Sequence, residues 1–161
     1  MQLLMQGTQK QQTGLTFPFL LGDFTDAYFA CTDANCGYKY ILSLCEDDVK
    51  QEHLQVMRSS AKKNGKILLT YAFIDSDTFD ANSAFETLCR ECEEHFNGML
   101  QDGVLVSCYS GFNRSAFVLI RLRSKLTNCS ILDSVANVCV SSRILQNRNF
   151  QTALAVILAT E

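Results

Sequence analysis

The sequence has little of several features that would define its class at once. It contains one proline and no tryptophan, and its 14 basic and 17 acidic residues leave a net charge of only −3. So weak a charge gives no support to a nonspecific nucleic-acid binder, although a local basic pocket stays open. The longest apolar run, Ala153–Ala159, is far short of the roughly 20 residues that a membrane span needs. We therefore expect no membrane segment and no nucleic-acid partner.

We expect no targeting signal at either end of the given sequence. The first residues, Met1–Gln6, have no basic region and too short an apolar stretch for a signal peptide. A Met-Gln start does not permit myristoylation, and the C-terminus is no prenylation signal. The eight cysteines are too few for a disulfide scaffold in a chain of this length. We expect a reducing compartment, the cytoplasm with the nucleus as a further location, and mostly buried, reduced cysteines.

What is present is the composition of one ordinary globular domain. The chain has 161 residues, of which 47% are hydrophobic and 19% charged. That length corresponds to a single domain with a core of its own. Residues 1–14 are rich in glutamine and glycine and predict a loose N-terminal tail, so the predicted domain covers residues 15–161.

The order of apolar segments predicts the fold class. Short β-type runs at 39–44, 66–73 and 104–106 alternate with segments of helical character. The expected helices are at 46–60, from a capping box at Ser83 through the apolar stripe to Met99, at 115–126, from Ser130, and at 147–159. Strands that alternate with helices predict an α/β fold with a central, mainly parallel sheet flanked by helices.

One stretch carries the chemistry. The apolar strand 104–106 leads to Cys108, and five residues with a central glycine separate Cys108 from Arg114-Ser115 and the next helix. Such a loop can point successive N–H groups inward, and the helix N-terminus adds positive potential, so the loop can bind an anion. Arg114 can hold two phosphate oxygens, and the same surroundings stabilise a thiolate at Cys108, to which Ser115 can hydrogen-bond. The candidate loop residues are Tyr109, Ser110, Gly111, Phe112 and Asn113.

The pattern Cys-x5-Arg-Ser resembles the signature of the cysteine-dependent protein tyrosine phosphatase superfamily, and the chain is similar to its small dual-specificity phosphatases. Asp75 follows an apolar strand and precedes Phe85 by ten residues, as the general acid does in that family. The last helix carries the family's Asn-x-x-Phe-x-x-x-Leu pattern, and the early apolar segments look like its first strands. The resemblance covers about residues 17–158, and its supporting motif residues are Asn147, Phe150 and Leu154.

The resemblance implies a protein tyrosine phosphatase-like sandwich and a reaction in two steps. Cys108 would attack phosphorus to form a phosphocysteine, while Arg114 and the N–H groups of residues 109–114 hold the oxygens. Asp75 would act first as the acid and then as the base, with Asp77 as its substitute, and Ser115 would stabilise the departing thiolate. No metal or cofactor is implied. The chain has no room for a phosphotyrosine recognition loop, so the implied substrates are phosphotyrosine and phosphoserine or phosphothreonine in phosphoproteins.

One departure from the family leaves alternatives open. Ser107 stands where the family almost always has a histidine that supports the cysteine. Serine can still donate a hydrogen bond, but it reaches less far and carries no charge, so a less stabilised thiolate or a looser loop is expected. A weakly active or non-catalytic phosphoprotein-binding module is therefore one alternative. An RNA 5′-phosphatase is another, because residues 111–114 echo capping enzymes, although the histidines of those enzymes are missing here.

Two other patterns have simpler interpretations. Cys89, Cys92 and His95 have a spacing that also occurs at zinc sites, but they share one stripe of a predicted helix. The two cysteines are interpreted as core residues, and a zinc site is not expected. Arg121 and Arg123 are expected to be solvated charges on the surface of a helix.

Overall fold

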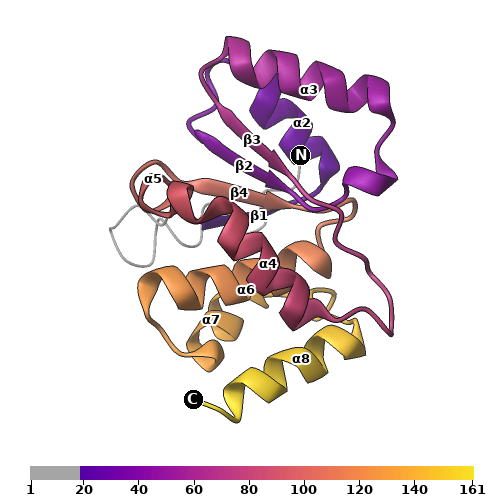
Figure 1. Ribbon diagram of the computed structural model, residues 1–161, viewed down its shortest axis with the longest axis vertical. Helices are drawn as coiled ribbons and strands as arrows, with labels where there is room; N and C mark the ends of the chain where they lie inside the picture. Colours follow the sequence, from indigo (N-terminus) through magenta and orange to yellow (C-terminus); the bar gives the residue numbers. More distant parts are fainter. Residues whose placement is uncertain (1–18) are drawn as a thin grey trace.

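The computed structural model describes residues 19–161, so the tail predicted for residues 1–14 lies outside it. Four parallel strands form one sheet in the order β1-β4-β2-β3. This confirms the predicted α/β class with a central parallel sheet (Figure 1). Because all strands run the same way, their carboxyl ends meet at one edge, where parallel sheets usually bind ligands. The strands are β1 (Phe19–Gly22), β2 (Tyr40–Ser43), β3 (Ile67–Thr70) and β4 (Val104–Ser107).

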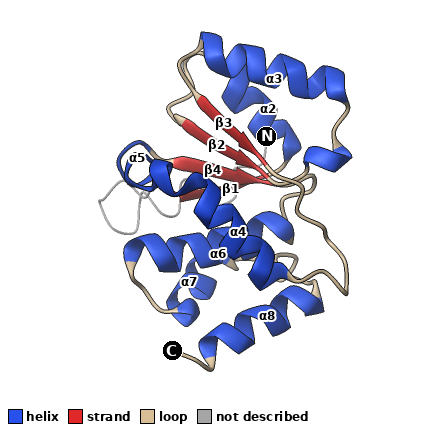
Figure 2. Ribbon diagram, in the orientation of Figure 1, coloured by secondary structure: helices blue, strands red, loops and turns tan. Residues whose placement is uncertain are grey.

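Helices cover both faces of the sheet (Figure 2). One face carries α2 (Phe24–Thr32) and α3 (Gln51–Lys63), which follows the short 3-10 helix η1 (Glu46–Asp48). The other face carries the remaining helices, with η2 (Glu93–His95) between two of them. Among residues 19–161, no helix is both long and apolar enough to cross a bilayer. The helices of the second face are α4 (Ala81–Cys92), α5 (Phe96–Asp102), α6 (Arg114–Thr127), α7 (Ile131–Val138) and α8 (Arg148–Leu158).

The central strands are buried on both sides because helices cover both faces of the sheet. Successive side chains of a strand point to opposite faces, so they enter two different cores. Leu105 of β4 packs with Ile41 in the core under α2 and α3. Val106, the next residue of β4, packs with Leu42 in the larger core under the other helices. The edge strand β3 is only half-buried. The sheet therefore holds two cores apart and fixes where Ser107 and the following loop emerge.

Most predicted elements are confirmed with shifted ends, but one predicted helix start is wrong. Ser130 caps α7 by accepting the N–H of Asp133, as expected. The capping box expected at Ser83 does not form, because α4 begins at Ala81, three residues before the first helical residue that this box implies. Asp80 is its N-cap and accepts the N–H of Ser83 at 3.1 Å. Asp80 is also a residue type that commonly caps helices, and it comes three residues before Ser83, so it starts the helix first.

The apolar stripe that predicted one helix through Met99 is divided into α4, η2 and α5. The turn brings Gly98 against the side chain of Tyr40, where a Cβ atom would collide with the Tyr40 ring. Met99 is still buried in the same core as Phe85. The stripe thus indicated the correct buried face but not the break, which depends on a tertiary contact with β2.

Helix α2 was not predicted. Its buried face carries Ala27, Ala30 and Cys31, but Phe29 on its outer side is 49% exposed. With apolar residues on both sides, the helical period is hard to detect in the sequence. The missed signal was a capping box at its start, where the carboxylates of Asp23 and Asp26 each accept the other's backbone N–H.

The structure also tests the two simpler interpretations. Cys89 and Cys92 are buried in the core, as predicted. The prediction for the arginines is wrong, because Arg123 is 7% exposed and the Arg121 side chain only 10%. Arg121 binds Glu86 at 2.9 Å and stacks over the Phe85 ring. The long arginine stem covers apolar surface here, and the charged head finds a partner on α4.

Buried thiols make the stability of the fold sensitive to high pH. Burial raises the pKa of Cys31 and Cys89 to about 12, and that of Cys92 to about 11, from an ordinary 9.0. The unfolded chain therefore loses these protons first as the pH rises. The stabilisation is complete below pH 9, and each thiol then removes up to about 1.4 kcal/mol per pH unit until its folded pKa is reached.

We expect urea unfolding in reducing buffer to show a falling free energy of unfolding between pH 9 and pH 11. The variant Cys89→Ala is less stable at neutral pH because it leaves a cavity. Its free energy of unfolding should nevertheless fall less steeply with pH, because one raised pKa is gone. Identical slopes for the variant and the wild type would contradict this origin of the pH dependence.

Candidate active site

The loop between β4 and α6 surrounds the sulfur of Cys108. Cys108 follows β4 directly, and its side chain is 1% exposed. The backbone N–H of Gly111 donates to Cys108 Sγ at 3.3 Å. Ser115 Oγ, from the first turn of α6, lies 3.2 Å from the same sulfur. The loop thus supplies two hydrogen-bonding groups to the sulfur of Cys108, just before the N-terminus of α6.

Backbone contacts hold the loop in this shape. Gly111 has φ +82°, and a Cβ atom there would lie 3.0 Å from the carbonyl oxygen of Gly22, so the position requires glycine. On one side, the N–H of Phe24 donates to Tyr109 O at 3.2 Å. On the other side, the N–H of Leu145 donates to Phe112 O at 2.7 Å. These contacts tie the loop to β1 and α2 on one side and to the segment before α8 on the other.

Arg114 presents one anchored edge and one free edge. Its Nη1 donates to Asp48 Oδ2 at 2.6 Å and to Phe73 O at 3.1 Å. Its Nε is buried and has no hydrogen-bond partner among the described residues. Burial alone would lower the pKa of Arg114, but Asp48 and the nearby Cys108 raise it. A buried, charged donor without a partner is costly, and an oxyanion in the loop would satisfy it.

Asp75 lines the same cleft as Arg114. The cleft has a volume of about 190 Å³ and is also lined by Asp47, Asp48, Phe73 and Ile74. Asp77, the substitute acid, is exposed and does not line it. Cys108 itself does not line this cleft. The structure therefore brings Cys108 against Ser115 at the start of α6 and sets Asp75 in one cleft with Arg114.

Two asparagines hold the Asp75 carboxylate. Asn147 Nδ2 donates to Asp75 Oδ1 at 2.6 Å, and Asn113 Nδ2 donates to Asp75 Oδ2 at 3.3 Å. The asparagines are joined as well, because the N–H of Asn147 donates to Asn113 Oδ1 at 3.0 Å. Asn147 also caps α8 by accepting the N–H of Phe150. The loop that carries Asp75 is thus tied both to the Cys108 loop and to the start of α8.

Sequence reasoning missed Asp48 and the contact that Asn147 makes with Asp75. Asp48 belongs to the acidic run 46–48, which gave only a polar surface segment. No local signal distinguishes it from Asp47, because its role depends on the sheet order that sets the end of β2 beside the end of β4. Asn147 was noted as part of a family pattern, and its contact with Asp75 bridges 72 positions of the chain.

Ser107 is the departure that the sequence singled out. Its side chain is completely buried, and its Oγ has no hydrogen-bond partner among residues 19–161. The hydrogen bond expected from this serine is therefore not made within the described part of the chain. The support around the sulfur comes from Gly111 and Ser115 instead.

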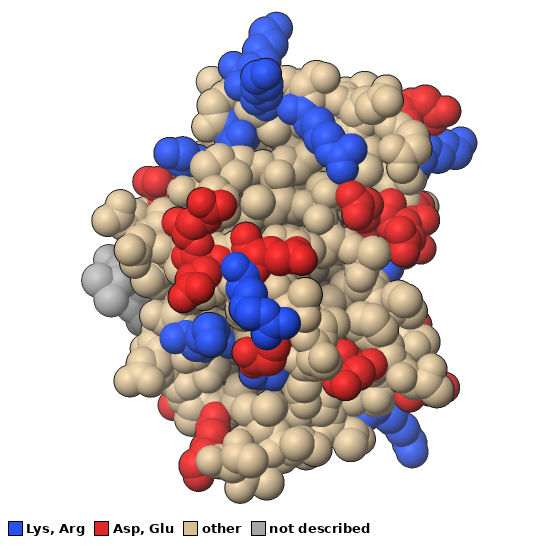
Figure 3. Space-filling model, viewed as in Figure 1, with Lys and Arg blue, Asp and Glu red and all other residues tan. Residues whose placement is uncertain are grey.

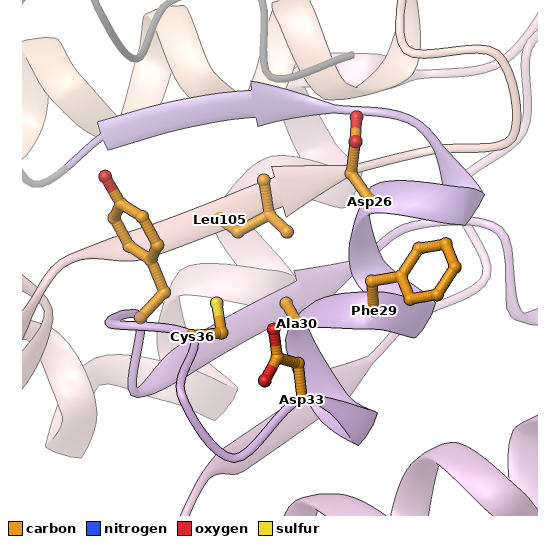
Figure 4. A pocket seen from close by; sticks show the side chains of 7 residues that line it. Asp26, Phe29, Ala30, Asp33, Cys36 and Leu105 are labelled. Atoms are coloured by element: carbon orange, nitrogen blue, oxygen red, sulfur yellow. The ribbon is translucent and has the colours of Figure 1, made fainter. Parts of the chain in front are cut away.

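A second cavity, of about 270 Å³, lies between α2 and β4 and is mostly apolar (Figure 4). Its lining includes neither an arginine nor Cys108, and the Asp26 carboxylate in it accepts the N–H of Asp23. Nothing in this lining would bind a phosphate. The residues around it are Asp26, Phe29, Ala30, Asp33, Cys36, Tyr38 and Leu105.

Solved structures of phosphatases and a phosphatase-like protein share this fold. No protein-family model and no curated protein sequence matches the chain. Among solved structures, human DUSP28 is similar with a TM-score of 0.67 and 17% identity over 89% of each chain. Tk-PTP in its active form has a TM-score of 0.64 and 16% identity over 89% of this chain and 91% of its own. The human tyrosine phosphatase-like serine/threonine/tyrosine-interacting protein has a TM-score of 0.61 and 17% identity over 89% of this chain and 92% of its own. These similarities confirm the predicted resemblance at the level of the fold.

Proposed function

We propose that this chain, which has the fold of the dual-specificity phosphatases, hydrolyses phosphotyrosine and phosphoserine or phosphothreonine in proteins through a phosphocysteine intermediate. One observation carries the proposal. The free Nε of Arg114 is a buried donor without a partner, in the loop that surrounds Cys108 Sγ. A phosphate seated there would receive hydrogen bonds from Arg114 while the sulfur faces its phosphorus.

In the first step, the Cys108 thiolate attacks phosphorus, and an S–P bond forms as the bond to the leaving oxygen breaks. The leaving oxygen takes that electron pair and a proton from Asp75, so it departs as a neutral alcohol or phenol. Arg114 and the loop N–H groups stabilise the charge on the three equatorial oxygens. Gly111 and Ser115 stabilise the thiolate before the attack.

In the second step, water attacks the phosphocysteine and gives its proton to the Asp75 carboxylate. The S–P bond breaks, and the sulfur keeps the electron pair as a thiolate to which Ser115 donates. Inorganic phosphate leaves, and Asp75 is protonated again for the next cycle. Every group used belongs to this chain or to water, so the proposed mechanism includes no metal and no cofactor.

Asp48 acts as a positioning residue in this scheme. With Phe73 O, its carboxylate fixes the Nη1 edge of Arg114, which leaves Nε and the opposite edge directed to the ligand. A guanidinium held in this way loses little rotational freedom when phosphate binds. The short contact of 2.6 Å is a charge-assisted hydrogen bond of the strong type.

The pH–rate profile of the variant Asp75→Asn tests the mechanism. We expect kcat for phenyl phosphate to fall about 100-fold, because a poor leaving group needs the proton from Asp75. The decline in rate at higher pH, where Asp75 loses that proton, should disappear. The loss should be smaller for p-nitrophenyl phosphate, which leaves readily without a proton. The measurement is steady-state hydrolysis from pH 4.5 to 8.5 under reductant.

Asp77→Asn is the matched control, because that carboxylate is in the same loop but outside the cleft. It should keep the bell-shaped profile of the wild type. An unchanged profile in Asp75→Asn, or the loss of the basic limb in Asp77→Asn instead, would remove Asp75 from the mechanism.

A non-catalytic phosphoprotein-binding module is the second candidate, and the buried Ser107 hydroxyl favours it. Without the histidine found in active relatives, the thiolate rests on Gly111 and Ser115 alone. Phosphopeptide binding that depends on Arg114, with no turnover of any aryl phosphate, would select this candidate. Activity that appears on Ser107→His would point the same way.

A further inference from the structure

The cleft that would receive the phosphate has a strongly negative wall. Three carboxylates, those of Asp47, Asp48 and Asp75, line it beside a single arginine. Asp48 is paired with Arg114, and Asp75 accepts from two amides. Asp47 is exposed and has no partner among the described residues. Figure 3 shows acidic side chains gathered where η1, which carries Asp47, lies in Figure 1.

An aromatic surface, here named the aromatic shelf, continues from the Cys108 loop. It consists of Tyr109, Phe24, Tyr28, Phe29 and His53. Tyr109 is 57% exposed, and its ring is stacked on Phe24 with an interplanar angle of 9° and a centroid distance of 6.1 Å. Phe24 and Tyr28 each lie within 6.4 Å of the His53 ring. Phe24, Tyr28, Phe29 and His53, but not Tyr109, line a hollow of about 270 Å³ together with Thr25.

The shelf and the acidic wall border the same site. The N–H of Phe24 bonds to Tyr109 O in the Cys108 loop. The Phe24 side chain packs against Cys45 and Val49, which flank η1 on either side. The rings and the unpaired Asp47 thus line two neighbouring hollows, which Phe24 connects.

We propose that the aromatic shelf and Asp47 bind an arginine or lysine side chain next to the phosphorylated residue of a protein substrate. The inference rests on the proposed function, since it places a phosphorylated residue at Arg114. A cation is attracted to the faces of aromatic rings and to a carboxylate. The hollow supplies the rings, and Asp47 supplies the carboxylate from the neighbouring Arg114 cleft. The cation also offsets the repulsion between the phosphate and the acidic wall, which Arg114 alone does not neutralise.

Other neighbours of the phosphate fit less well. An apolar side chain would cover the rings but leave the Asp47 carboxylate facing the phosphate. A triphosphorylated RNA end would bring further negative charge to the same wall. The acidic wall therefore favours a basic phosphopeptide over both.

The test uses phosphopeptides of one sequence that differ only at the residues flanking the phosphorylated position, which are arginine, lysine, alanine, leucine or glutamate. At pH 7.5 we expect kcat/KM to be about tenfold higher for arginine and lysine than for alanine, and lowest for glutamate. The preference should weaken in 0.5 M salt, because exposed charges are screened. Equal kcat/KM across the set, or a preference for leucine or glutamate, would overturn the inference.

Two variants locate the preference. Asp47→Asn should reduce the ratio of the arginine to the glutamate peptide about fivefold and lower the KM for a small aryl phosphate, because it removes repulsion. Tyr109→Leu should reduce the same ratio, because it removes a ring face. Glu46→Gln is the matched control, since that carboxylate already binds Arg58 and Thr70, and it should keep the ratio. Reduction by Glu46→Gln but not by Asp47→Asn would overturn the assignment.

Binding to the Cys108→Ser variant separates this inference from the proposed function. If the wild type hydrolyses nothing but the variant still binds the arginine peptide more tightly than the glutamate peptide, the enzymatic proposal fails and the inference stands. If aryl phosphate is hydrolysed and no peptide preference appears, the inference alone fails. Faster release of γ-phosphate from triphosphorylated RNA than from any peptide would overturn both.

Discussion

Replacing Cys108 by serine is expected to lower aryl phosphate hydrolysis by at least about 10⁴-fold, because removing a nucleophile leaves only binding and electrostatic stabilisation. A serine hydroxyl in place of the thiol is a much poorer nucleophile, because it does not ionise in the pH range of the assay. The loop and Arg114 stay in place, so a phosphopeptide should still bind. Steady-state hydrolysis and peptide binding by calorimetry measure the two effects separately.

The matched control is Cys36→Ser, since Cys36 is half-buried and lies in the other cavity. It should retain activity within about twofold. If Cys36→Ser and Cys108→Ser lost activity equally, the loss would reflect folding rather than chemistry. If Cys108→Ser hydrolysed the substrate as fast as the wild type, the phosphocysteine intermediate would be ruled out.

Arg114→Lys is expected to reduce kcat/KM about 10³-fold despite the unchanged charge. The guanidinium uses one edge to bind Asp48 and Phe73 O and keeps Nε for the ligand. A lysine ammonium is a single point and cannot hold both sides at once. We expect the variant to have both a higher KM and a lower kcat. Steady-state hydrolysis measured over a range of aryl phosphate concentrations gives the two constants separately.

Asp48→Asn serves as the comparison for Arg114→Lys. It keeps an oxygen acceptor for Nη1 but removes the charge, so the loss should be about tenfold. A larger loss in Asp48→Asn than in Arg114→Lys would contradict the positioning role and would indicate that Asp48 itself takes part in the chemistry. Wild-type activity in Arg114→Lys would contradict the role of the guanidinium.

The sequence was informative about the sheet where burial leaves a strong local pattern. The apolar run before Cys108 predicted β4, and Ser130 correctly indicated the cap of α7. The start of α4 was misplaced because two capping residues, Asp80 and Ser83, compete and sequence pattern alone does not rank them. Helix α2 was not predicted, because the exposed Phe29 on its outer side hides the difference between an apolar and a polar helix face.

The candidate site divides in the same way. The Cys108 to Ser115 stretch is contiguous, so its chemistry could be inferred from residue types and spacing. Asp75 was inferred from family spacing, and the structure places it in the Arg114 cleft. Asp48 could not be inferred, because a carboxylate 66 positions from Arg114 is identified only when the strand order is known. Tertiary contacts of this kind leave no trace in a single sequence.

The hydrogen bonds that join Asn113, Asp75 and Asn147 connect the start of α8 to the candidate site. In the proposed mechanism, the N-cap of this helix, Asn147, holds the acid Asp75 beside the Cys108 loop. Proteolytic cleavage after Gln146 would free that N-cap while leaving Cys108 and Arg114 in their loop. In the proposed mechanism, the cleaved protein would still bind a phosphate. It would release the leaving alcohol or phenol slowly, because Asp75 would no longer be held beside the Cys108 loop.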